Sequence, residues 1–321
     1  MKILMPEYKT LTRGDIDMSG FERLGDLVIL DHPTPEELNA ELKDTDILFV
    51  NKIVVTDELL EHAPKLRYIG ECATGYNNID LKACKARGIT VTFVPSYSTN
   101  AVAQHVFSLM LDHFGRVRDY SIDTKAGGWT ASGNFANMIF PTEELEGKTI
   151  GLVGYGRIGQ RVAAIAHAFG MNVLATSRSF VSGWSGDGVT QFTDLETLLK
   201  TADVVSVHCP LNDESHHLFN RERFALMKEG AFFINTARGP IVDEEALAES
   251  LRSGHLSGAA LDVLEEEPMR ADCALQDIEN CIITPHVAWA PRETRQRLVD
   301  VVLENVQAWL EGASLNVVEA D

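Results

Sequence analysis

The chain has 321 residues, of which 45% are hydrophobic and 23% charged, a composition typical of a globular protein long enough for two domains. Its formal net charge of −19 argues against non-specific binding to nucleic acid or to an anionic membrane surface. The five cysteines are scattered and form no C-x-x-C pair, so they indicate neither a zinc site nor a disulfide framework. No run approaches the ~18 apolar residues that span a bilayer, and no signal-peptide apolar region is evident, so a cytoplasmic location is expected.

Residues 1–95 alternate short apolar runs with helical patterns, which predicts a mostly parallel sheet with helices on both faces. The predicted strands are Lys2–Met5, Asp26–Leu30, Asp46–Val50, Tyr68–Gly70 and Thr90–Val94; the predicted helices are Pro35–Lys43, capped by Thr34, Asp57–His62 and Asp80–Arg87. Ligands of such sheets collect at the carboxyl ends of the strands. Residues 50–52 and 73–78 follow two of these ends, so both are candidate ligand-binding segments.

A strongly amphipathic helix of about four turns follows from about residue 99. Its apolar stripe consists of Val102, Val106, Leu109, Met110 and Leu111. His105 and His113 on this helix are candidate ligands, but a hydrogen-bonded helix histidine is the favoured interpretation, because no carboxylate cluster lies beside them in the sequence. A polar loop is expected around residues 127–129 and 134–141.

The alternation of strands and helices resumes at Thr149 and predicts a complete dinucleotide-binding domain of six strands. The predicted strands are Thr149–Val153, Asn172–Ala175, Asp203–Val207, Ala231–Asn235, Gly258–Val263 and Cys281–Thr284; the predicted helices are Arg157–Phe169, Asp194–Thr201, Arg221–Met227 and Glu244–Ser253. A capping box is expected at Thr193-x-x-Glu196, and Asp243 is expected to cap the helix that follows it.

A last long helix, from Pro291 to about Leu310, carries a mostly apolar face that needs a partner. Because the second sheet is complete before this helix begins, we expect the helix to return to the first domain. The predicted domains are therefore residues 1–98 with 290–321, and residues 99–289, with the active site in the cleft between them. Two crossings of the chain at such a cleft are what a hinge needs.

The stretch Gly154-x-Gly156-x-x-Gly159 stands between a predicted strand and a predicted helix, which is the context of a dinucleotide-binding loop. Gly154 permits a tight turn, Gly156 lets a pyrophosphate approach the backbone, and Gly159 lets helix and strand pack closely. Arg157 and Ile158 open the helix, whose unpaired N–H groups and dipole attract phosphate. The alternative is a glycine turn without a ligand.

The second strand of this domain lacks the acidic residue that usually holds the ribose hydroxyls of NAD. Ser177 stands near its place and Arg178 follows, and these two side chains could bind a 2′-phosphate. The sequence therefore favours NADP over NAD. The alternative is that Arg178 points to solvent and either cofactor binds.

Three later strand ends carry an arginine, carboxylates and a histidine. Arg238 can grip a carboxylate with two hydrogen bonds, and His286 can exchange a proton near neutral pH, oriented by a carboxylate on its other ring nitrogen. Beside a dinucleotide site, this set suggests reduction of a carbonyl next to a carboxylate. Separately, Arg238 could be a surface ion pair and residues 265–267 a solvated acidic turn.

Over essentially its full length the chain resembles the D-isomer-specific 2-hydroxyacid dehydrogenases, and most closely their glycerate dehydrogenase/hydroxypyruvate reductase branch. The matching stretches are Ala73-Thr-Gly-Tyr-Asn-Asn-Ile-Asp80, Gly147-Lys-Thr-Ile-Gly-Leu-Val-Gly-Tyr-Gly-Arg-Ile-Gly159, His208-Cys-Pro-Leu211, Asn235-Thr-Ala-Arg-Gly239, Gly258-Ala-Ala-Leu-Asp-Val263, Glu266-Glu-Pro268 and Thr284-Pro-His-Val-Ala-Trp289. The ending His286-Val-Ala-Trp289 points to the glycerate branch. The resemblance implies an α/β fold of two Rossmann-like or flavodoxin-like domains with parallel sheets.

The resemblance also implies roles for particular residues. Arg238 would hold the substrate carboxylate and carbonyl oxygen, His286 would be the general acid or base, and Glu267 would pair with His286. Asp262 would hold the nicotinamide carboxamide, while Cys209, Pro210 and Thr236 would line the cofactor. The predicted substrate-binding set adds Asn51, backbone groups of Thr74 and Gly75, and Trp289, which either limits substrate bulk or only packs at the domain edge.

The predicted function is thus reversible NAD(P)-dependent reduction of a small 2-keto acid, hydroxypyruvate or glyoxylate, to its D-2-hydroxy acid, without a metal. The helix from about residue 99 is a candidate homodimer surface, which the resemblance supports. One rival is a dinucleotide-sensing binding protein similar to the corepressors that resemble this family. The complete set of Arg238, Glu267 and His286 argues against lost catalysis. The other rival is a different oxidoreductase on the same scaffold, such as a phosphite dehydrogenase.

Overall fold

The chain divides into two compact units, each described here by itself. The computed structural model describes residues 1–178 and 189–318. Met1–Ser98 and Trp289–Asp321 form the first unit, and Thr99–Ala288 forms the second. The sequence prediction assigned Trp289 to the second domain, whereas its packing places it in the first unit. Within the described ranges, no helix has the length and apolar character required to cross a membrane.

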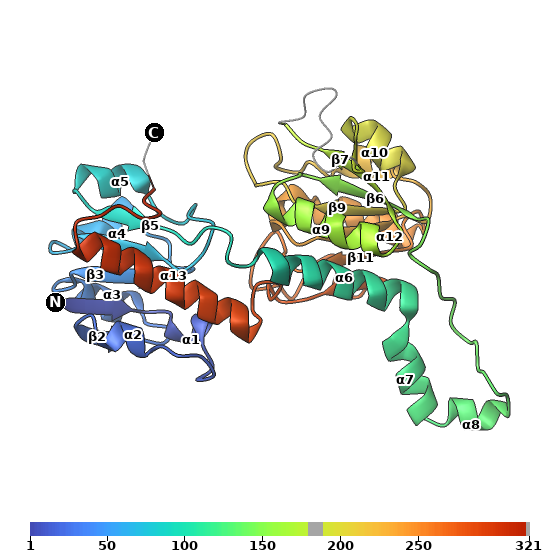
Figure 1. Ribbon diagram of the computed structural model, residues 1–321, viewed down its shortest axis with the longest axis horizontal. Coiled ribbons are helices and arrows are strands. Elements are labelled where there is room, and N and C mark those ends of the chain that lie inside the picture. Colours follow the sequence, from blue (N-terminus) through green and yellow to red (C-terminus); the bar gives the residue numbers. More distant parts are fainter. Residues whose placement is uncertain (179–188, 319–321) are drawn as a thin grey trace. The chain divides into compact units, whose positions relative to one another are not determined.

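The first unit is built on a five-stranded parallel sheet in the order β2-β1-β3-β4-β5 (Figure 1). Its strands are β1 (Lys2–Met5), β2 (Asp26–Ile29), β3 (Ile47–Val50), β4 (Tyr68–Glu71) and β5 (Thr90–Thr92). These confirm the predicted strands, with ends that shift by at most two residues. The strand order reverses between β1 and β3, so the carboxyl ends of these two strands mark the place where such sheets bind ligands.

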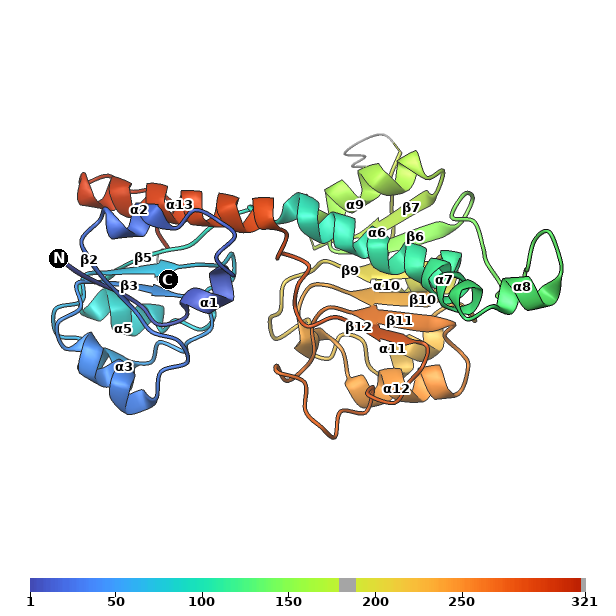
Figure 2. The same ribbon diagram turned by 90° about the horizontal axis from the view of Figure 1, so that it is seen from below.

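Helices cover both faces of this sheet because successive strand side chains point to opposite sides (Figure 2). One face packs on α3 (Pro35–Leu42), α4 (Asp57–Glu61) and α5 (Leu81–Ala86); the other packs on α13 (Arg292–Leu310) and on the short α1 (Tyr8–Leu11) and α2 (Ser19–Glu22). Ile3 contributes to the α13 side and Leu4 to the α3 side, for example. The sequence prediction missed α1 and α2, since four-residue helices show no periodicity.

The second unit contains a seven-stranded parallel sheet in the order β12-β11-β10-β9-β6-β7-β8. Its strands are β6 (Thr149–Val153), β7 (Asn172–Thr176), β8 (Gln191–Phe192), β9 (Val204–Val207), β10 (Phe232–Asn235), β11 (Gly258–Leu261) and β12 (Cys281–Ile283). The prediction of six strands was wrong by one, because the two-residue edge strand β8 is too short to show an alternating pattern. The order reverses between β6 and β9, as in dinucleotide-binding sheets.

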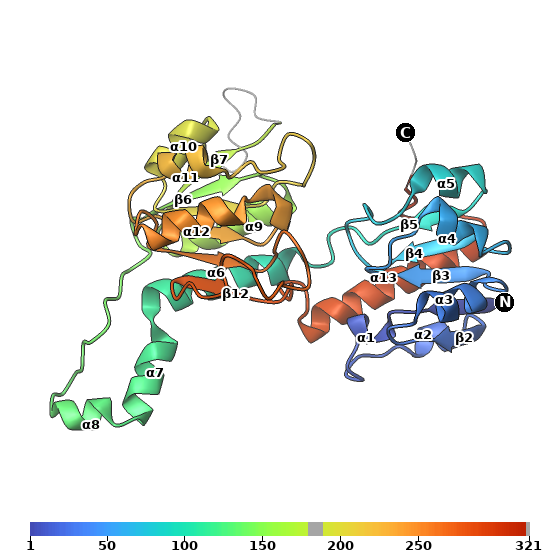
Figure 3. The ribbon, with the colours of Figure 1, turned by 180° about the vertical axis from the view of Figure 1, so that it is seen from behind.

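Helices α6 (Thr99–Gly115) and α9 (Arg157–Ala168) cover one face of this sheet, and α10 (Leu195–Thr201), α11 (Arg221–Leu226) and α12 (Glu244–Arg252) cover the other (Figures 2 and 3). Most of the predicted apolar stripe of α6 is buried in this core, with Val106 and Met110 fully enclosed. The buried part of this stripe packs on α9 and the sheet within the unit; that this helix forms a homodimer surface stays a prediction.

After α6 the chain forms an arm of two helices, α7 (Val117–Lys125) and α8 (Gly128–Ser132), and an extended return (Figure 3). The sequence prediction treated residues 127–129 as loop, and α8 corrects it: Gly127 adopts a left-handed φ of 93° and starts a new helical turn at Gly128. The predicted capping box at Thr193 is also corrected. Asp194 caps α10 by accepting a hydrogen bond from the Thr197 amide at 2.8 Å.

A buried acid at the end of β4 makes the stability of the first unit depend on pH. Glu71 is inaccessible to solvent, and burial raises the pKa of its carboxyl to about 8, an effect to which the nearby negative Glu7 adds. Its Oε2 accepts a hydrogen bond from the Asn78 amide at 3.0 Å, whereas within the described residues Oε1 has no hydrogen-bond partner. The unfolded chain titrates near 4.5, so between about 4.5 and 8 the folded state holds the extra proton and stability falls as pH rises.

We expect Glu71→Gln to remove this pH dependence. The variant should gain about 1–3 kcal/mol in unfolding free energy over the wild type at alkaline pH and little or nothing at acidic pH, because the amide never ionises. Urea unfolding of both proteins across the pH range measures the difference. Parallel stability profiles for the two proteins would show that Glu71 does not titrate in this range.

Candidate active site

The glycine-rich turn after β6 has the geometry of a phosphate-binding loop. Gly154 has a φ of 103°, and a Cβ there would lie 2.6 Å from the Cys209 amide nitrogen. A Cβ at Gly159 would lie 2.4 Å from the Gly154 carbonyl oxygen, so helix and loop approach as closely as the sequence predicts. Gly156, the N-cap of α9, is different: a Cβ there would meet no protein atom within 4 Å. The space beside Gly156 is therefore open to a ligand.

The residues around this turn fit a dinucleotide. The amino end of α9 begins at Arg157 and Ile158, where the first N–H groups of the helix can donate to phosphate oxygens. Thr236, at the end of β10, has a buried hydroxyl that has no hydrogen-bond partner among the described residues. A buried hydroxyl without a partner costs free energy unless a ligand or water satisfies it. The predicted cofactor residues Gly154, Gly156, Gly159 and Thr236 thus fit the group that their motif implies.

Ser177 and Arg178 directly follow β7, as predicted. The Arg178 guanidinium lies 3.6 Å from the Glu214 carboxylate, and both side chains are more than two-thirds exposed, 70% and 77%. An exposed pair at this distance contributes little, so Arg178 can exchange Glu214 for another anion.

The end of β9 supplies neutral groups. His208 is bonded to the Ser206 hydroxyl at 2.9 Å, and burial lowers the pKa of its imidazole to about 4. Burial also raises the pKa of the Cys209 thiol. A protonated thiol is a poor nucleophile, so this edge, including Pro210, offers a neutral wall rather than a reactive group.

Arg238 lies just beyond β10 and is held by its own turn. The Arg238 carbonyl oxygen accepts a hydrogen bond from the side-chain amide of Asn235 at 2.9 Å. The Arg238 Nη1 donates to the Ala237 carbonyl at 2.7 Å. The neighbouring Gly239 packs against the segment after β11 so closely that a Cβ would lie 1.7 Å from the Leu264 carbonyl oxygen. The half-buried guanidinium is thus fixed at the carboxyl edge of the sheet.

His286 and Glu267 form the pair that the sequence predicts. The His286 Nδ1 lies 2.6 Å from Glu267 Oε2, and 27% of the histidine side chain remains accessible. Glu267 Oε1 accepts a hydrogen bond from the Leu264 amide at 3.1 Å, which fixes the carboxylate. A carboxylate on Nδ1 holds the proton there and leaves Nε2 to exchange a proton with a ligand.

Asp262 acts on the chain around His286. It is 1% exposed, and its carboxylate accepts hydrogen bonds from the amides of Val287 at 2.9 Å and Ala288 at 2.8 Å. The Thr284 hydroxyl donates to it at 2.6 Å and is in turn 3.0 Å from His105 Nε2. Both oxygens of Asp262 thus bind the segment that carries His286; its contact with the nicotinamide carboxamide stays a prediction.

His105 has neighbours in the fold that the sequence does not reveal. The sequence shows no carboxylate near it, yet folding brings Asp262 Oδ1 within 3.5 Å of its Nε2. The favoured interpretation, a hydrogen-bonded helix histidine, is confirmed by its bond to Thr284. The position of that bond, directly behind the His286 segment, could not be read from helical spacing, because the two residues are 179 positions apart.

In the first unit, the predicted substrate residue Asn51 forms hydrogen bonds with Glu7 and Thr10 of the same chain. It is 5% exposed, and its side-chain amide donates to the Thr10 hydroxyl at 3.0 Å. The Glu7 carboxylate accepts hydrogen bonds from the amides of Asn51, Lys52 and Ile53 at 2.9, 2.9 and 3.0 Å. Glu7 thus binds the amides that follow β3 at the strand-order reversal, and Asn51 as a substrate-binding residue stays a prediction.

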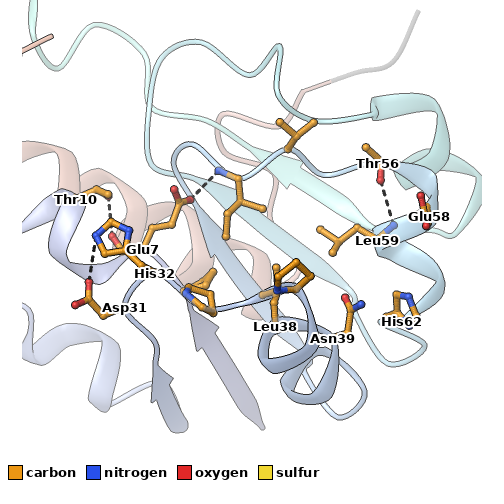
Figure 4. A pocket seen from close by; sticks show the side chains of 15 residues that line it. Glu7, Thr10, Asp31, His32, Leu38, Asn39, Thr56, Glu58, Leu59 and His62 are labelled. Carbon is orange, nitrogen blue, oxygen red and sulfur yellow. Dashed lines mark hydrogen bonds and ion pairs between the residues drawn. The ribbon is translucent and has the colours of Figure 1, made fainter. Parts of the chain in front are cut away.

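Glu7 also borders a cavity of about 550 Å³ at the carboxyl ends of β1, β2 and β3 (Figure 4). Asp31 and His32 lie beside it, and Leu38 of α3 and Leu59 of α4 form apolar walls. This cavity contains neither Thr74 nor Gly75, so it is separate from the predicted substrate segment.

The predicted segment after β4 retains free donors. Thr74 is exposed, and its hydroxyl donates to the Val94 carbonyl at 2.7 Å, which fixes the turn. Within the described residues, the backbone amides of Thr74 and Gly75 donate to no protein acceptor. Trp289 packs edge-on against Tyr97, with ring centroids 6.3 Å apart, in the core of the first unit. The substrate contacts of Thr74, Gly75 and Trp289 remain predictions.

Comparison with known proteins agrees with this geometry. Residues 107–288 match the model of the D-isomer specific 2-hydroxyacid dehydrogenase NAD-binding domain. A hydroxypyruvate reductase of Blautia hydrogenotrophica is 37% identical over 321 residues, covering 99% of both chains. A glycerate dehydrogenase of Methylorubrum extorquens is 38% identical, covering 89% of this chain and 90% of its own. The crystal structure of the TT0316 protein from Thermus thermophilus superposes with a TM-score of 0.89 at 37% identity, covering 99% of this chain and all of its own. The chain therefore belongs to the D-isomer specific 2-hydroxyacid dehydrogenase family, whose members are nicotinamide-dependent oxidoreductases.

Proposed function

We propose that this protein reduces a small 2-keto acid, hydroxypyruvate or glyoxylate, to the corresponding D-2-hydroxy acid, and catalyses the reverse oxidation. The observation that carries the proposal is the bond of 2.6 Å between His286 and Glu267, at the same sheet edge as Arg238 and the glycine-rich turn. An acid–base group, a guanidinium and a dinucleotide loop together are what hydride transfer to a 2-keto acid requires.

Each residue has a separate task in this reaction. The glycine-rich turn would hold a reduced nicotinamide cofactor, which would supply the hydride for the keto carbon. Arg238 holds the substrate carboxylate and polarises the carbonyl oxygen. His286 gives its Nε2 proton to that oxygen, and Glu267 stabilises the ring in the orientation required. Asp262 fixes the backbone after His286, so the ring keeps its place through the reaction.

The first unit offers further donors for the substrate. The unpaired amides of Thr74 and Gly75 would bind its carboxylate, as the sequence predicts. The cleft between the domains, the closure at the two chain crossings and the role of Trp289 stay predictions. The five free cysteines accord with the proposed cytoplasmic location, where thiols remain reduced.

Initial rates with hydroxypyruvate, glyoxylate and pyruvate, each run with NADH and with NADPH, test the proposal. Turnover on hydroxypyruvate or glyoxylate supports it, and the ranking of the three acids identifies the substrate. Absence of turnover on every 2-keto acid, with cofactor still bound, would instead support the dinucleotide-sensing rival. Activity on phosphite alone would support the other rival.

We expect the cofactor preference to depend on Arg178. Replacing Arg178 with Gln should raise the KM for NADPH roughly 10- to 100-fold and change the KM for NADH little, because only NADPH offers a 2′-phosphate. Glu214→Gln is the matched control: it removes the partner of Arg178 but keeps the guanidinium, so NADPH should bind at least as well. An unchanged NADPH/NADH ratio in Arg178→Gln would mean that this arginine faces solvent.

We also propose that two copies associate through the arm. Its exposed apolar side chains include Val117 (71% exposed), Phe135 (97%) and Met138 (87%), and several exposed apolar side chains on one segment favour an interface. The double substitution Phe135→Ser with Met138→Ser should convert a dimer into a monomer in sedimentation experiments. Val54→Ser, an exposed apolar site in the first unit, is the control and should leave the assembly unchanged. A wild-type monomer would contradict the proposal.

A further inference from the structure

A cluster of metal-ligating side chains lies outside the proposed catalytic set. His216 and His217 belong to the loop between β9 and α11, and Glu265 follows β11. One ligand atom from each of the three residues can be chosen so that all lie within 4.8 Å of one another. We propose that these three residues bind a divalent transition-metal ion. The proposal is independent of the reaction that the protein catalyses.

The backbone explains how two adjacent histidines can serve one ion. Successive side chains of an extended chain point to opposite sides, which would separate the two rings. His217 instead has a φ of 45°, in the left-handed region that is costly for a residue with a Cβ. The resulting turn places the two ring centroids 4.2 Å apart with an interplanar angle of 31°. Both imidazoles therefore lie on the same side of the loop.

Bonds that do not involve the ligand atoms hold this turn in place. The His217 amide donates to the Pro240 carbonyl at 2.8 Å, which ties the loop to the end of β10. Ser215, which is buried, donates its hydroxyl to the Pro210 carbonyl at 2.7 Å and closes the loop on itself. On the other side, the Glu265 amide donates to the Glu244 carboxylate at 2.6 Å. The loop after β9 and the segment after β11 are thus both held in place before any ion binds, which lowers the entropy cost of ordering them on binding.

The side chains themselves remain accessible. The His217 Nε2 lies 2.7 Å from Glu265 Oε1, and the two side chains are 38% and 42% exposed. His216 is exposed as well. An ion at about 2.0–2.2 Å from each donor would replace the His217–Glu265 hydrogen bond with two ligand bonds. His216 would supply the third ligand atom.

The donor set decides which ions fit. Two imidazole nitrogens and one carboxylate oxygen suit Zn²⁺, Ni²⁺ and Co²⁺, whereas Mg²⁺ and Ca²⁺ prefer all-oxygen sites. Three protein ligands leave a further position for water. A bound ion would join the loop after β9 to the segment after β11, and Glu267 lies two residues farther along that segment.

Calorimetric titration of the full-length protein with Ni²⁺, and the visible spectrum of the protein with Co²⁺, test the site. We expect saturable binding of one ion per chain and no comparable binding of Mg²⁺. His216→Ala and Glu265→Gln should each weaken Ni²⁺ binding at least tenfold, about the effect of losing even a supporting partner of a metal ligand. His255→Ala, which changes a histidine bonded to the Phe224 carbonyl elsewhere in the same unit, is the matched control and should bind normally.

A second histidine–carboxylate pair of this unit, His286 with Glu267, must be separated from the proposed site. His286→Asn should retain Ni²⁺ binding, because His286 and Glu267 are not part of the cluster. Circular dichroism and thermal unfolding without metal check that each variant is folded. Wild-type affinity in folded His216→Ala and Glu265→Gln, loss of binding only in His286→Asn, or no saturable binding by the wild type would each overturn the proposal.

Discussion

Replacing His286 with asparagine is expected to lower turnover on 2-keto acids roughly 10²- to 10⁴-fold, the range that general acid–base catalysis contributes. Asparagine is close in size to part of the imidazole and can still hydrogen-bond to Glu267, but its amide cannot deliver a proton to the substrate oxygen. Steady-state kinetics measure the loss. Binding of NADH or NADPH, followed by fluorescence, should change little. The glycine-rich turn follows β6, whereas His286 follows β12 at one end of the strand order.

His255→Asn is the control for this prediction, since it makes the same replacement at a histidine that precedes the amino end of β11, opposite the strand ends that carry the proposed site. It should leave turnover intact. Glu267→Gln should give an intermediate loss, because the amide can still contact Nδ1 without the negative charge that stabilises a protonated ring. Near-normal turnover in His286→Asn would remove the proton-transfer role from this residue.

The second large effect is expected at Arg238. Replacing it with Gln should lower kcat/KM for hydroxypyruvate roughly 10²- to 10³-fold. Bound substrate would cover the half-buried guanidinium, and losing one partner of such a covered charge pair typically costs about 2–5 kcal/mol. Arg238→Lys should recover only part of this loss, since an ammonium group keeps the charge but cannot donate two parallel hydrogen bonds. The expected loss appears in both KM and kcat, because the guanidinium contacts the carboxylate and the carbonyl oxygen whose charge develops during reduction.

Arg221→Gln supplies the comparison, as its guanidinium pairs with Glu249 on the helical face of the same unit. An exposed pair of this kind contributes little, so both kinetic constants should stay near those of the wild type. If Arg238→Gln kept the wild-type KM and kcat, the substrate carboxylate would have to be bound elsewhere, and the amides of Thr74 and Gly75 would be the first alternative.

The sequence alone determined the two α/β units and the place of the glycine-rich turn, and it predicts that Arg238, Glu267 and His286 form one group. These follow from local rules: buried parallel strands give apolar runs, and a strand, a glycine turn and a helix in succession identify the dinucleotide loop. Once the strands are known to be parallel, their carboxyl ends must meet at one edge, so residues after β10, β11 and β12 come together even though they are far apart in the chain.

Only the tertiary structure decided which distant groups form hydrogen bonds near these sites. Glu7 binds the amides after β3 from 44 or more positions away, and His105 reaches Thr284 across 179 positions. Such contacts leave no periodic trace in the sequence, because each is a single hydrogen bond between distant segments. The apolar stripe of α6 shows the same limit. Its pattern predicts that it is covered, but the choice between α9 and a second copy of the chain depends on packing, which spacing alone does not contain.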